Sequence, residues 1–193
     1  MAKPLVIVFA RAPRYGTVKS RLARDIGALE ALRFYRMVLG RLMRRMSRDV
    51  RFDTVVAMTP DLQGIGPHGV RCVGQGSGDL GARMIRALRS AGRRPAVVIG
   101  SDIPDLTPRH VAYAFDALKS ASVVLGPARD GGYWLIGARN SAELAPRALA
   151  GVRWSSRHAL NDTLERLRDA HVLDTVLDDV DDGAAYRRVV GRV

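Results

Sequence analysis

The sequence is poor in cysteine and has no long apolar run, and both absences narrow the classes of protein to which it can belong. Its 193 residues include a single cysteine, Cys72, and four scattered histidines. One cysteine forms no internal disulfide, and this set builds no usual zinc site. No apolar run is long enough to cross a bilayer, and the run from Leu5 to Ala10 is too short for a signal-peptide core. We therefore expect a cytoplasmic protein without a membrane span.

Lysine is also scarce, since it occurs only at positions 3, 19 and 119, and arginine carries most of the formal net charge of +12. A basic protein attracts polyanions, including phosphorylated small molecules. The cluster of arginines over residues 41–48 has helical spacing and lacks the interleaved aromatics of a single-strand binding surface. These arginines are typical of a solvated helix face, so nucleic acid is not an expected partner.

The remaining composition is that of a globular protein, with 47% hydrophobic residues. This length suits one domain with a full-sized core, so we expect residues 1–193 to form a single domain. The sequence does not fix the oligomeric state, and a homodimer is compatible with it.

Short apolar runs alternate with helical patterns along the chain, which predicts an α/β fold with a mostly parallel sheet and helices on both faces. The runs Leu5–Phe9 and Ala96–Ile99 are apolar throughout, as a parallel strand covered on both faces requires. Gly40 is expected to weaken or bend the first helix. The predicted strands cover residues 5–9, 54–58, 70–73, 96–99, 122–125, 133–137 and 172–177. The predicted helices cover residues 19–46, 79–91, 108–119, 157–170 and 183–190.

The loop after the first strand concentrates positive charge near the start of a long helix, with Arg11, Arg14, Lys19 and Arg21. Parallel sheets bind ligands outside the carboxyl ends of their strands. A helix N-terminus favours phosphate and disfavours further cations unless an anion binds there. Lys19 is the strongest indication of an anion-binding site, because the chain has arginine at nearly every other basic position. The spacing alone is equally consistent with a solvated basic turn, and no Walker phosphate-binding loop is present.

Acidic residues follow two later strands. Asp102 ends the apolar strand predicted over residues 96–99, where an unpartnered carboxylate is costly, and a hard divalent cation would be a suitable partner. The alternative for Asp102 is a cap or turn residue. Asp130 precedes Gly131 and Gly132, whose backbone can approach a ligand closely. Asp130 is a candidate for orienting an acceptor hydroxyl or for acid–base chemistry, and the same residues also fit a tight hairpin turn.

Two further stretches are candidates on weaker grounds. The acidic run Asp178–Asp182 would hold a metal ion, although from the run alone an exposed helix start is slightly favoured. The glycine-rich stretch Gly74–Gly81 lacks a full dinucleotide fingerprint. We interpret it as a loop that packs against a base or ribose, with Gly78 and Gly81 as the contact positions.

Four motifs occur together and in order, and they carry a family resemblance. They are Phe9-x-Arg11-x-Pro13-x-x-Gly16-x-Val18-Lys19-Ser20-Arg21-Leu22, Gly78-Asp79-Leu80-Gly81-x-Arg83-Met84, Gly100-Ser101-Asp102-x-Pro104 and Gly126-Pro127-x-x-Asp130-Gly131-Gly132-Tyr133. The chain resembles the bacterial glycosyltransferase-like family of unknown function in the nucleotide-diphospho-sugar transferase superfamily. It is similar also to 2-phospho-lactate guanylyltransferase. The resemblance extends from Leu5 to about Tyr186.

The resemblance implies a glycosyltransferase-A fold that uses Mg²⁺ or Mn²⁺. In the superfamily the first loop holds the triphosphate, which maps here to Arg11, Lys19 and Arg21. The aspartate after the fourth strand is a metal ligand, which maps to Asp102. A late Asp-Val-Asp run supplies a second metal ligand in many members, which maps to Asp181.

The sequence departs from the superfamily pattern in two places. Superfamily pyrophosphorylases usually carry a glycine-rich first loop, whereas this loop has only Gly16. Gly183 and Ala184 stand where a proline and an acid usually follow the late acidic run.

These observations predict a metal-dependent transferase acting on a nucleoside triphosphate or nucleotide-sugar. The leading hypothesis is nucleotidyl transfer to a small acceptor with release of pyrophosphate, in which Lys19, Asp102 and Asp130 are the catalytic residues. The nucleotide would contact the first loop together with Gly78, Gly81, Gly131 and Gly132. The second hypothesis is glycosyl transfer from a nucleotide-diphospho-sugar, and the third is a non-catalytic nucleotide- or polyanion-binding protein on the same fold.

Overall fold

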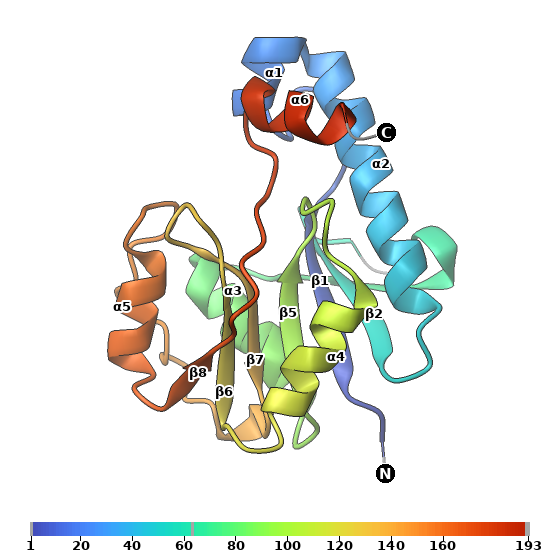
Figure 1. Ribbon diagram of the computed structural model, residues 1–193. Coiled ribbons are helices and arrows are strands. Elements are labelled where there is room, and N and C mark those ends of the chain that lie inside the picture. The colour runs from blue at the N-terminus through green and yellow to red at the C-terminus, as the bar shows by residue number, and fades with distance from the viewer. Residues whose placement is uncertain (1, 63, 192–193) are drawn as a thin grey trace.

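A computed structural model describes residues 2–62 and 64–191 (Figure 1). Its eight-stranded sheet has the order β3-β4-β2-β1-β5-β7-β6-β8. The strands are β1 (Leu5–Arg11), β2 (Asp53–Thr59), β3 (Gly64–Ile65), β4 (Arg71–Gly74), β5 (Ala96–Gly100), β6 (Val123–Pro127), β7 (Tyr133–Ala138) and β8 (Ala170–Val172). The helices are α1 (Ser20–Ile26), α2 (Ala28–Ser47), α3 (Leu80–Arg89), α4 (Pro108–Ala117), α5 (Ala159–Arg166) and α6 (Gly183–Val190).

The sheet is mostly parallel, as the sequence predicts. The pairs β1–β2, β1–β5, β2–β4 and β6–β8 are parallel, whereas β3 and β7 run antiparallel to their neighbours. β6 and β7 form a hairpin whose connection contains Asp130, in agreement with the predicted turn. The carboxyl ends of the parallel strands therefore share one edge of the sheet, where ligands bind in folds of this kind.

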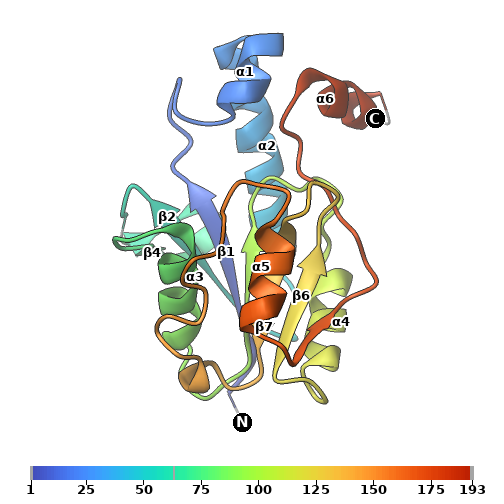
Figure 2. The same ribbon diagram turned by 90° about the vertical axis from the view of Figure 1, so that its left-hand side faces the viewer.

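Helices cover both faces of the sheet, and each face has its own core (Figures 1 and 2). Alternate residues of β1 divide between the two cores, since Val6 and Val8 pack with α2 and α4 while Leu5 and Ile7 pack with α3 and α5. All four side chains are at most 3% exposed. This burial on both faces confirms the interpretation of the continuous apolar run as a central parallel strand.

The first helix differs from the prediction, because the chain breaks it at Gly27 and continues as α2. Gly27 has φ +85°, a left-handed conformation that glycine adopts without steric cost, and its N–H caps α1 by donating to the Ala23 carbonyl. Gly40 lies inside α2 without ending it, and the expected weakening or bend at that residue stays a prediction. The break turns α1 away from the axis of α2.

The strand predicted over residues 172–177 is also wrong, since β8 ends at Val172. The following residues 173–182, here called the strap, leave the sheet and run beside β6 and β7 towards the carboxyl edge. Single hydrogen bonds hold the strap, including one from the Trp134 indole Nε1 to the Thr175 carbonyl at 3.0 Å. Figure 1 shows the strap rising past the sheet to α6.

Helix α6 has the bounds that the sequence predicts. It packs on α1 and α2 above the carboxyl edge of the sheet (Figure 1). The contact forms a small core of its own around Leu22, Phe34 and Val180. The rings of Phe34 and Tyr186 meet edge to face at 5.1 Å. This packing anchors the far end of the strap. Among the described residues, no helix combines the length and the apolar character that a membrane span needs.

Candidate active site

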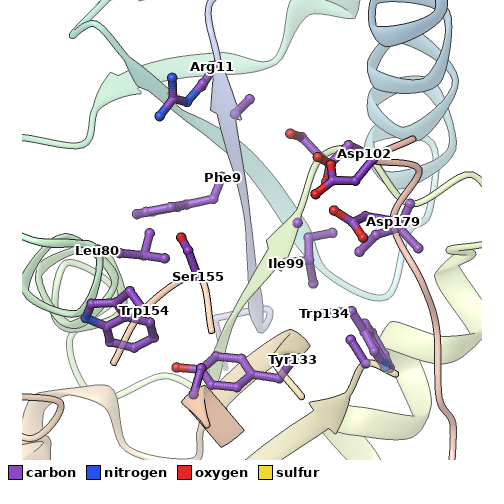
Figure 3. Close-up of a pocket in the computed structure, with 18 of the residues that line it drawn as sticks. Phe9, Arg11, Leu80, Ile99, Asp102, Tyr133, Trp134, Trp154, Ser155 and Asp179 are labelled. Atoms are coloured by element: carbon purple, nitrogen blue, oxygen red, sulfur yellow. The ribbon is translucent and has the colours of Figure 1, made fainter. Parts of the chain in front are cut away.

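A cleft of about 940 Å³ opens at the carboxyl edge of the sheet (Figure 3). The ends of β1 and β5 form its floor, and the first loop, the start of α3 and the strap contribute walls. Figure 3 places Asp102 and Asp179 on one side of the cleft and Phe9, Tyr133 and Trp154 on the other, with Trp134 below Asp179.

Lys19 lies at the centre of the acidic end. Its ammonium Nζ is 2.6 Å from Asp102 Oδ2, 2.7 Å from Asp181 Oδ1 and 3.7 Å from Asp179 Oδ2. The Lys19 side chain is 4% exposed, whereas the three aspartates are 29–45% exposed. The sequence predicts that a cationic first loop faces an acidic strand end, and the structure places Lys19 and Asp102 in direct contact.

The backbone of Lys19 is strained. It has φ +51° and ψ +48° immediately before α1, in the left-handed region that non-glycine residues rarely adopt. Such conformations cost free energy and cluster at functional sites. The strain directs the Lys19 side chain towards the carboxylates, and it is a second, independent feature that marks this position.

The charges of this cluster shift one another's protonation. Burial alone would lower the pKa of Lys19, but Asp102 and Asp181 outweigh it and raise the pKa above its ordinary value, so Lys19 stays charged. Burial raises the pKa of Asp179 to about 7, with the neighbouring carboxylates adding to the effect. Burial acts in the same direction on Asp181, but Lys19 outweighs it and holds the pKa of that carboxyl below its usual range.

The three carboxylates have the chemistry of a divalent-cation site. One oxygen from each of Asp102, Asp179 and Asp181 lies within 4.8 Å of the others. Mg²⁺ and Mn²⁺ prefer such hard oxygen ligands. The Lys19 ammonium already stands among these oxygens as a cation, so the donor set fits a metal ion provided that Nζ moves aside. Asp179 was not predicted individually, although its spacing of two from Asp181 in an extended segment is a signal for a shared face.

Tyr35 joins the strand ends beneath the acidic cluster. Its hydroxyl donates to the Arg11 carbonyl and accepts from the Arg11 N–H, both at 3.0 Å, and lies 3.2 Å from Ser101 Oγ. Burial raises the pKa of Tyr35, so the hydroxyl remains a donor at neutral pH. Tyr35 thereby fixes the end of β1 to the residue before Asp102. No local sequence pattern indicates this contact, because α2 places Tyr35 there through tertiary packing.

The structure brings most of the other predicted residues to the same cleft. Arg11 and Arg21 both line it, and Arg21 Nη1 is 3.7 Å from Asp181 Oδ2. Asp130 and Gly132 also line it, and the Asp130 carboxylate accepts a hydrogen bond from the Gly132 N–H at 2.9 Å. Gly131 has φ +84° and supports the turn beside them. The roles assigned to these residues stay predictions.

Gly78 and Gly81 do not line the cleft among the described residues, and packing explains both glycines. Gly78 has φ +101° before Asp79, whose side chain caps α3 by accepting from the Ala82 N–H. A Cβ on Gly81 would lie 2.7 Å from Trp154 Cζ2. The predicted contact of these two positions with a base or ribose stays a prediction.

Comparison with known proteins agrees with this geometry. A family model described as "Uncharacterized protein conserved in bacteria (DUF2064)" matches residues 42–156. The chain belongs to this bacterial family. No curated protein matches the sequence of this chain.

Solved structures resemble this DUF2064 protein over almost its whole length. A protein of Desulfovibrio desulfuricans G20, provisionally named as a nucleotide-diphospho-sugar transferase, has a TM-score of 0.84 and 29% identity, over 94% of this chain and 84% of that one. A CMP:2-keto-3-deoxy-manno-octonic acid synthetase complexed with CTP has a TM-score of 0.61 and 14% identity, over 99% and 98%. Rv0371c of Mycobacterium tuberculosis H37Rv, in complex with manganese, has a TM-score of 0.58 and 17% identity, over the full length of both chains.

These likenesses confirm the fold and the family resemblance that the four motifs indicate. The last two proteins share too little sequence with this chain to show more than the fold. The DUF2064 protein thus has the α/β fold of the nucleotide-diphospho-sugar transferases, and the transferase class predicted from its sequence is the class of these neighbours.

Proposed function

We propose that this DUF2064 protein is a metal-dependent nucleotidyltransferase that uses a nucleoside triphosphate and a small acceptor. The observation that carries the proposal is the convergence of Lys19 with Asp102, Asp179 and Asp181 in one cleft at the carboxyl edge of the sheet. A phosphate chain needs cations, and a bound divalent metal needs carboxylates. This cluster offers both on one wall of the cleft.

In the proposed reaction an oxygen of the acceptor attacks the α-phosphorus of the nucleotide. A new P–O bond forms, the bond to the β-phosphate breaks, and pyrophosphate leaves. Lys19 and Arg21 would stabilise the negative charge on the phosphates, and Arg11 would contact them from the end of β1. Little covalent chemistry is then required of the protein beyond positioning and charge stabilisation.

Asp102, Asp181 and Asp179 would hold the Mg²⁺ or Mn²⁺ ion, which supplies Lewis-acid stabilisation of phosphate charge when bound. Metal binding would release the Lys19 ammonium from the carboxylates towards the phosphates. Asp130 would orient the acceptor or accept its proton, and its exposed position in the same cleft supports this role.

Pyrophosphate release tests this proposal. Wild-type protein is incubated with Mg²⁺ or Mn²⁺, each common nucleoside triphosphate and a broad panel of small acceptors. We expect release with at least one pair, and its loss in Asp102→Asn. Asp105→Asn is the matched control, because Asp105 lies in the same loop but outside the carboxylate cluster and the cleft lining. No release with any pair would contradict nucleotidyl transfer.

Glycosyl transfer from a nucleotide-diphospho-sugar is the second candidate. The likeness to the Desulfovibrio protein at 29% identity favours it, and it uses the same fold and metal. Binding separates the two candidates. Nucleotidyl transfer predicts that a nucleoside triphosphate saturates the site without a sugar, whereas glycosyl transfer predicts tighter binding of the nucleoside diphosphate-sugar.

A further inference from the structure

The end of the cleft opposite the acidic cluster is an aromatic hollow, formed by Phe9, Leu80, Tyr133 and Trp154 (Figure 3). The rings of Tyr133 and Trp154 meet edge to face, with centroids 6.3 Å apart and an interplanar angle of 78°. In Figure 3, Phe9 and Leu80 lie on the far side of Ser155 from Tyr133. Four carbon-rich side chains thus surround one part of a cleft whose other end is highly charged.

Trp154 is held firmly in this position. Its ring lies against the first turn of α3, where a Cβ on Gly81 would come within 2.7 Å of Cζ2. The indole Nε1 is buried and has no hydrogen-bond partner among the described residues, so packing alone fixes the ring. The absence of a side chain at position 81 is therefore what allows Trp154 to form a wall of the hollow.

The residue after Trp154 is strained. Ser155 has φ +56°, and Lys19 and His68 are the other non-glycine residues with positive φ in the described part of the chain. Ser155 and Lys19 both line the cleft, one at each end. Because left-handed non-glycine residues persist only where the surroundings enforce them, this pairing marks the aromatic end as well as the acidic end as functional.

The walls of the hollow are mostly apolar, and a cationic side chain lies on the loop beside it. The Tyr133 hydroxyl accepts a hydrogen bond from Thr163 Oγ1 at 3.5 Å and keeps its own proton to donate, Ser155 adds a second hydroxyl, and Phe9 and Leu80 offer no polar atom. Two hydroxyls replace only part of the hydrogen bonding to water that a buried nucleobase would lose. Arg157 follows on the same loop, is exposed and lines the cleft, so it can pair with a carboxylate or phosphate at the rim.

We propose that the aromatic hollow is the acceptor site, and that the acceptor is a small anion with an apolar or ring-shaped body. Its carbon body lies against Trp154 and Tyr133, and its carboxylate or phosphate pairs with Arg157. The role of this ligand as the acceptor rests on the proposed nucleotidyl transfer. Its chemical class follows from the side chains of the hollow and Arg157 alone.

Binding of phenyl phosphate, which combines a ring with an anionic group, tests the inference without metal or nucleotide. The chain has two tryptophans, so the ¹⁵N-labelled protein gives two indole N–H signals by NMR, and Trp134→Phe identifies them. We expect phenyl phosphate to shift the Trp154 signal saturably and more than the Trp134 signal. Inorganic phosphate and benzyl alcohol, each with one of the two features, are expected to bind more weakly.

Variants locate the anionic contact. Arg157→Gln is expected to raise the dissociation constant of phenyl phosphate about tenfold, since one charge-assisted hydrogen bond is lost. Arg147→Gln is the matched control, because Arg147 is exposed and lies outside the cleft lining, and it is expected to change nothing. A shift that does not saturate, or an Arg157→Gln titration equal to that of the wild type, would overturn the inference.

Two further titrations separate this inference from the proposed function. Nucleosides without phosphate should bind the hollow more weakly than phenyl phosphate, and tighter binding would assign the hollow to the base and overturn the acceptor site. Asp102→Asn should leave the phenyl phosphate titration unchanged, because the acidic cluster takes no part in it. The acceptor site and the metal site can therefore fail independently.

Discussion

Replacing Lys19 by methionine removes the cation from the acidic cluster while keeping an unbranched side chain of similar length. Removing one partner of a buried ion pair costs about 3–5 kcal/mol, because the opposite charge is left uncompensated. The Lys19 side chain is 4% exposed, but its aspartate partners are 29–45% exposed, so water screens part of the loss. We therefore expect Lys19→Met to lower the free energy of unfolding by about 2 kcal/mol in the absence of metal.

Thermal unfolding with EDTA and with Mn²⁺ measures this effect. For a chain of this size, a loss of about 2 kcal/mol lowers Tm by about 4–8 °C. Mn²⁺ should raise the Tm of Lys19→Met more than that of the wild type, because no ammonium competes for the carboxylates and binding to the native state stabilises it. Its binding would also replace the missing positive charge.

Lys119→Met is the matched control. Lys119 pairs with Asp116 at 2.7 Å, but both side chains are highly exposed, at 80% and 65%, so its removal should change Tm little. An unchanged Tm for Lys19→Met, or an equal response of both proteins to Mn²⁺, would refute the view that Lys19 occupies the cation position.

Three further predictions follow from contacts around the cleft. Asp25 accepts a hydrogen bond from the Gly183 N–H at 2.7 Å and so fixes the end of the strap beyond Asp181. Asp25→Ala should therefore weaken Mn²⁺ binding measured by calorimetry, and Asp25→Asn should bind Mn²⁺ almost as tightly as the wild type; equal Mn²⁺ affinities for Asp25→Ala and the wild type would remove this positioning role. Ser155→Gly should raise the free energy of unfolding by about 1 kcal/mol in urea titrations by relieving the left-handed strain, with Ser155→Ala neutral as the control, and no gain would contradict the strain. Gly131→Ala should lower Tm far more than Gly16→Ala, because both have positive φ but only at Gly131 would a Cβ strike the Arg157 backbone; equal losses would refute the close packing of these two loops.

Much of the fold was predictable from local patterns. The continuous apolar runs at residues 5–9 and 96–99 indicated central parallel strands, and both are buried on two faces. The end of the first helix was not predictable from periodicity, because Gly27 acts through its backbone conformation and not through hydrophobicity. The strap was mistaken for a strand because its apolar residues contact the core while only single hydrogen bonds join it to the sheet.

The site residues that could be predicted are charged residues that follow the end of a strand or precede the start of a helix. Asp102 and Lys19 were identified because strand ends and helix starts share one edge of an α/β sheet, and the structure joins them at 2.6 Å. Tyr35, Trp154 and Ser155 were missed, since they reach the cleft through tertiary packing that no local pattern encodes. The spacing of the first loop fits a phosphate site and a solvated basic turn equally well, and in the structure three carboxylates surround Lys19.

In the proposed function, the acidic cluster holds a divalent metal that the nucleotide needs for binding. A thermal-shift panel of nucleoside triphosphates, with and without Mg²⁺, tests this requirement, because a ligand that binds only the native state raises Tm. We predict a nucleotide-induced shift in the wild-type protein that requires Mg²⁺ and is abolished in Asp102→Asn. A shift of the same size in Asp102→Asn, or one that does not depend on Mg²⁺, would contradict the claim.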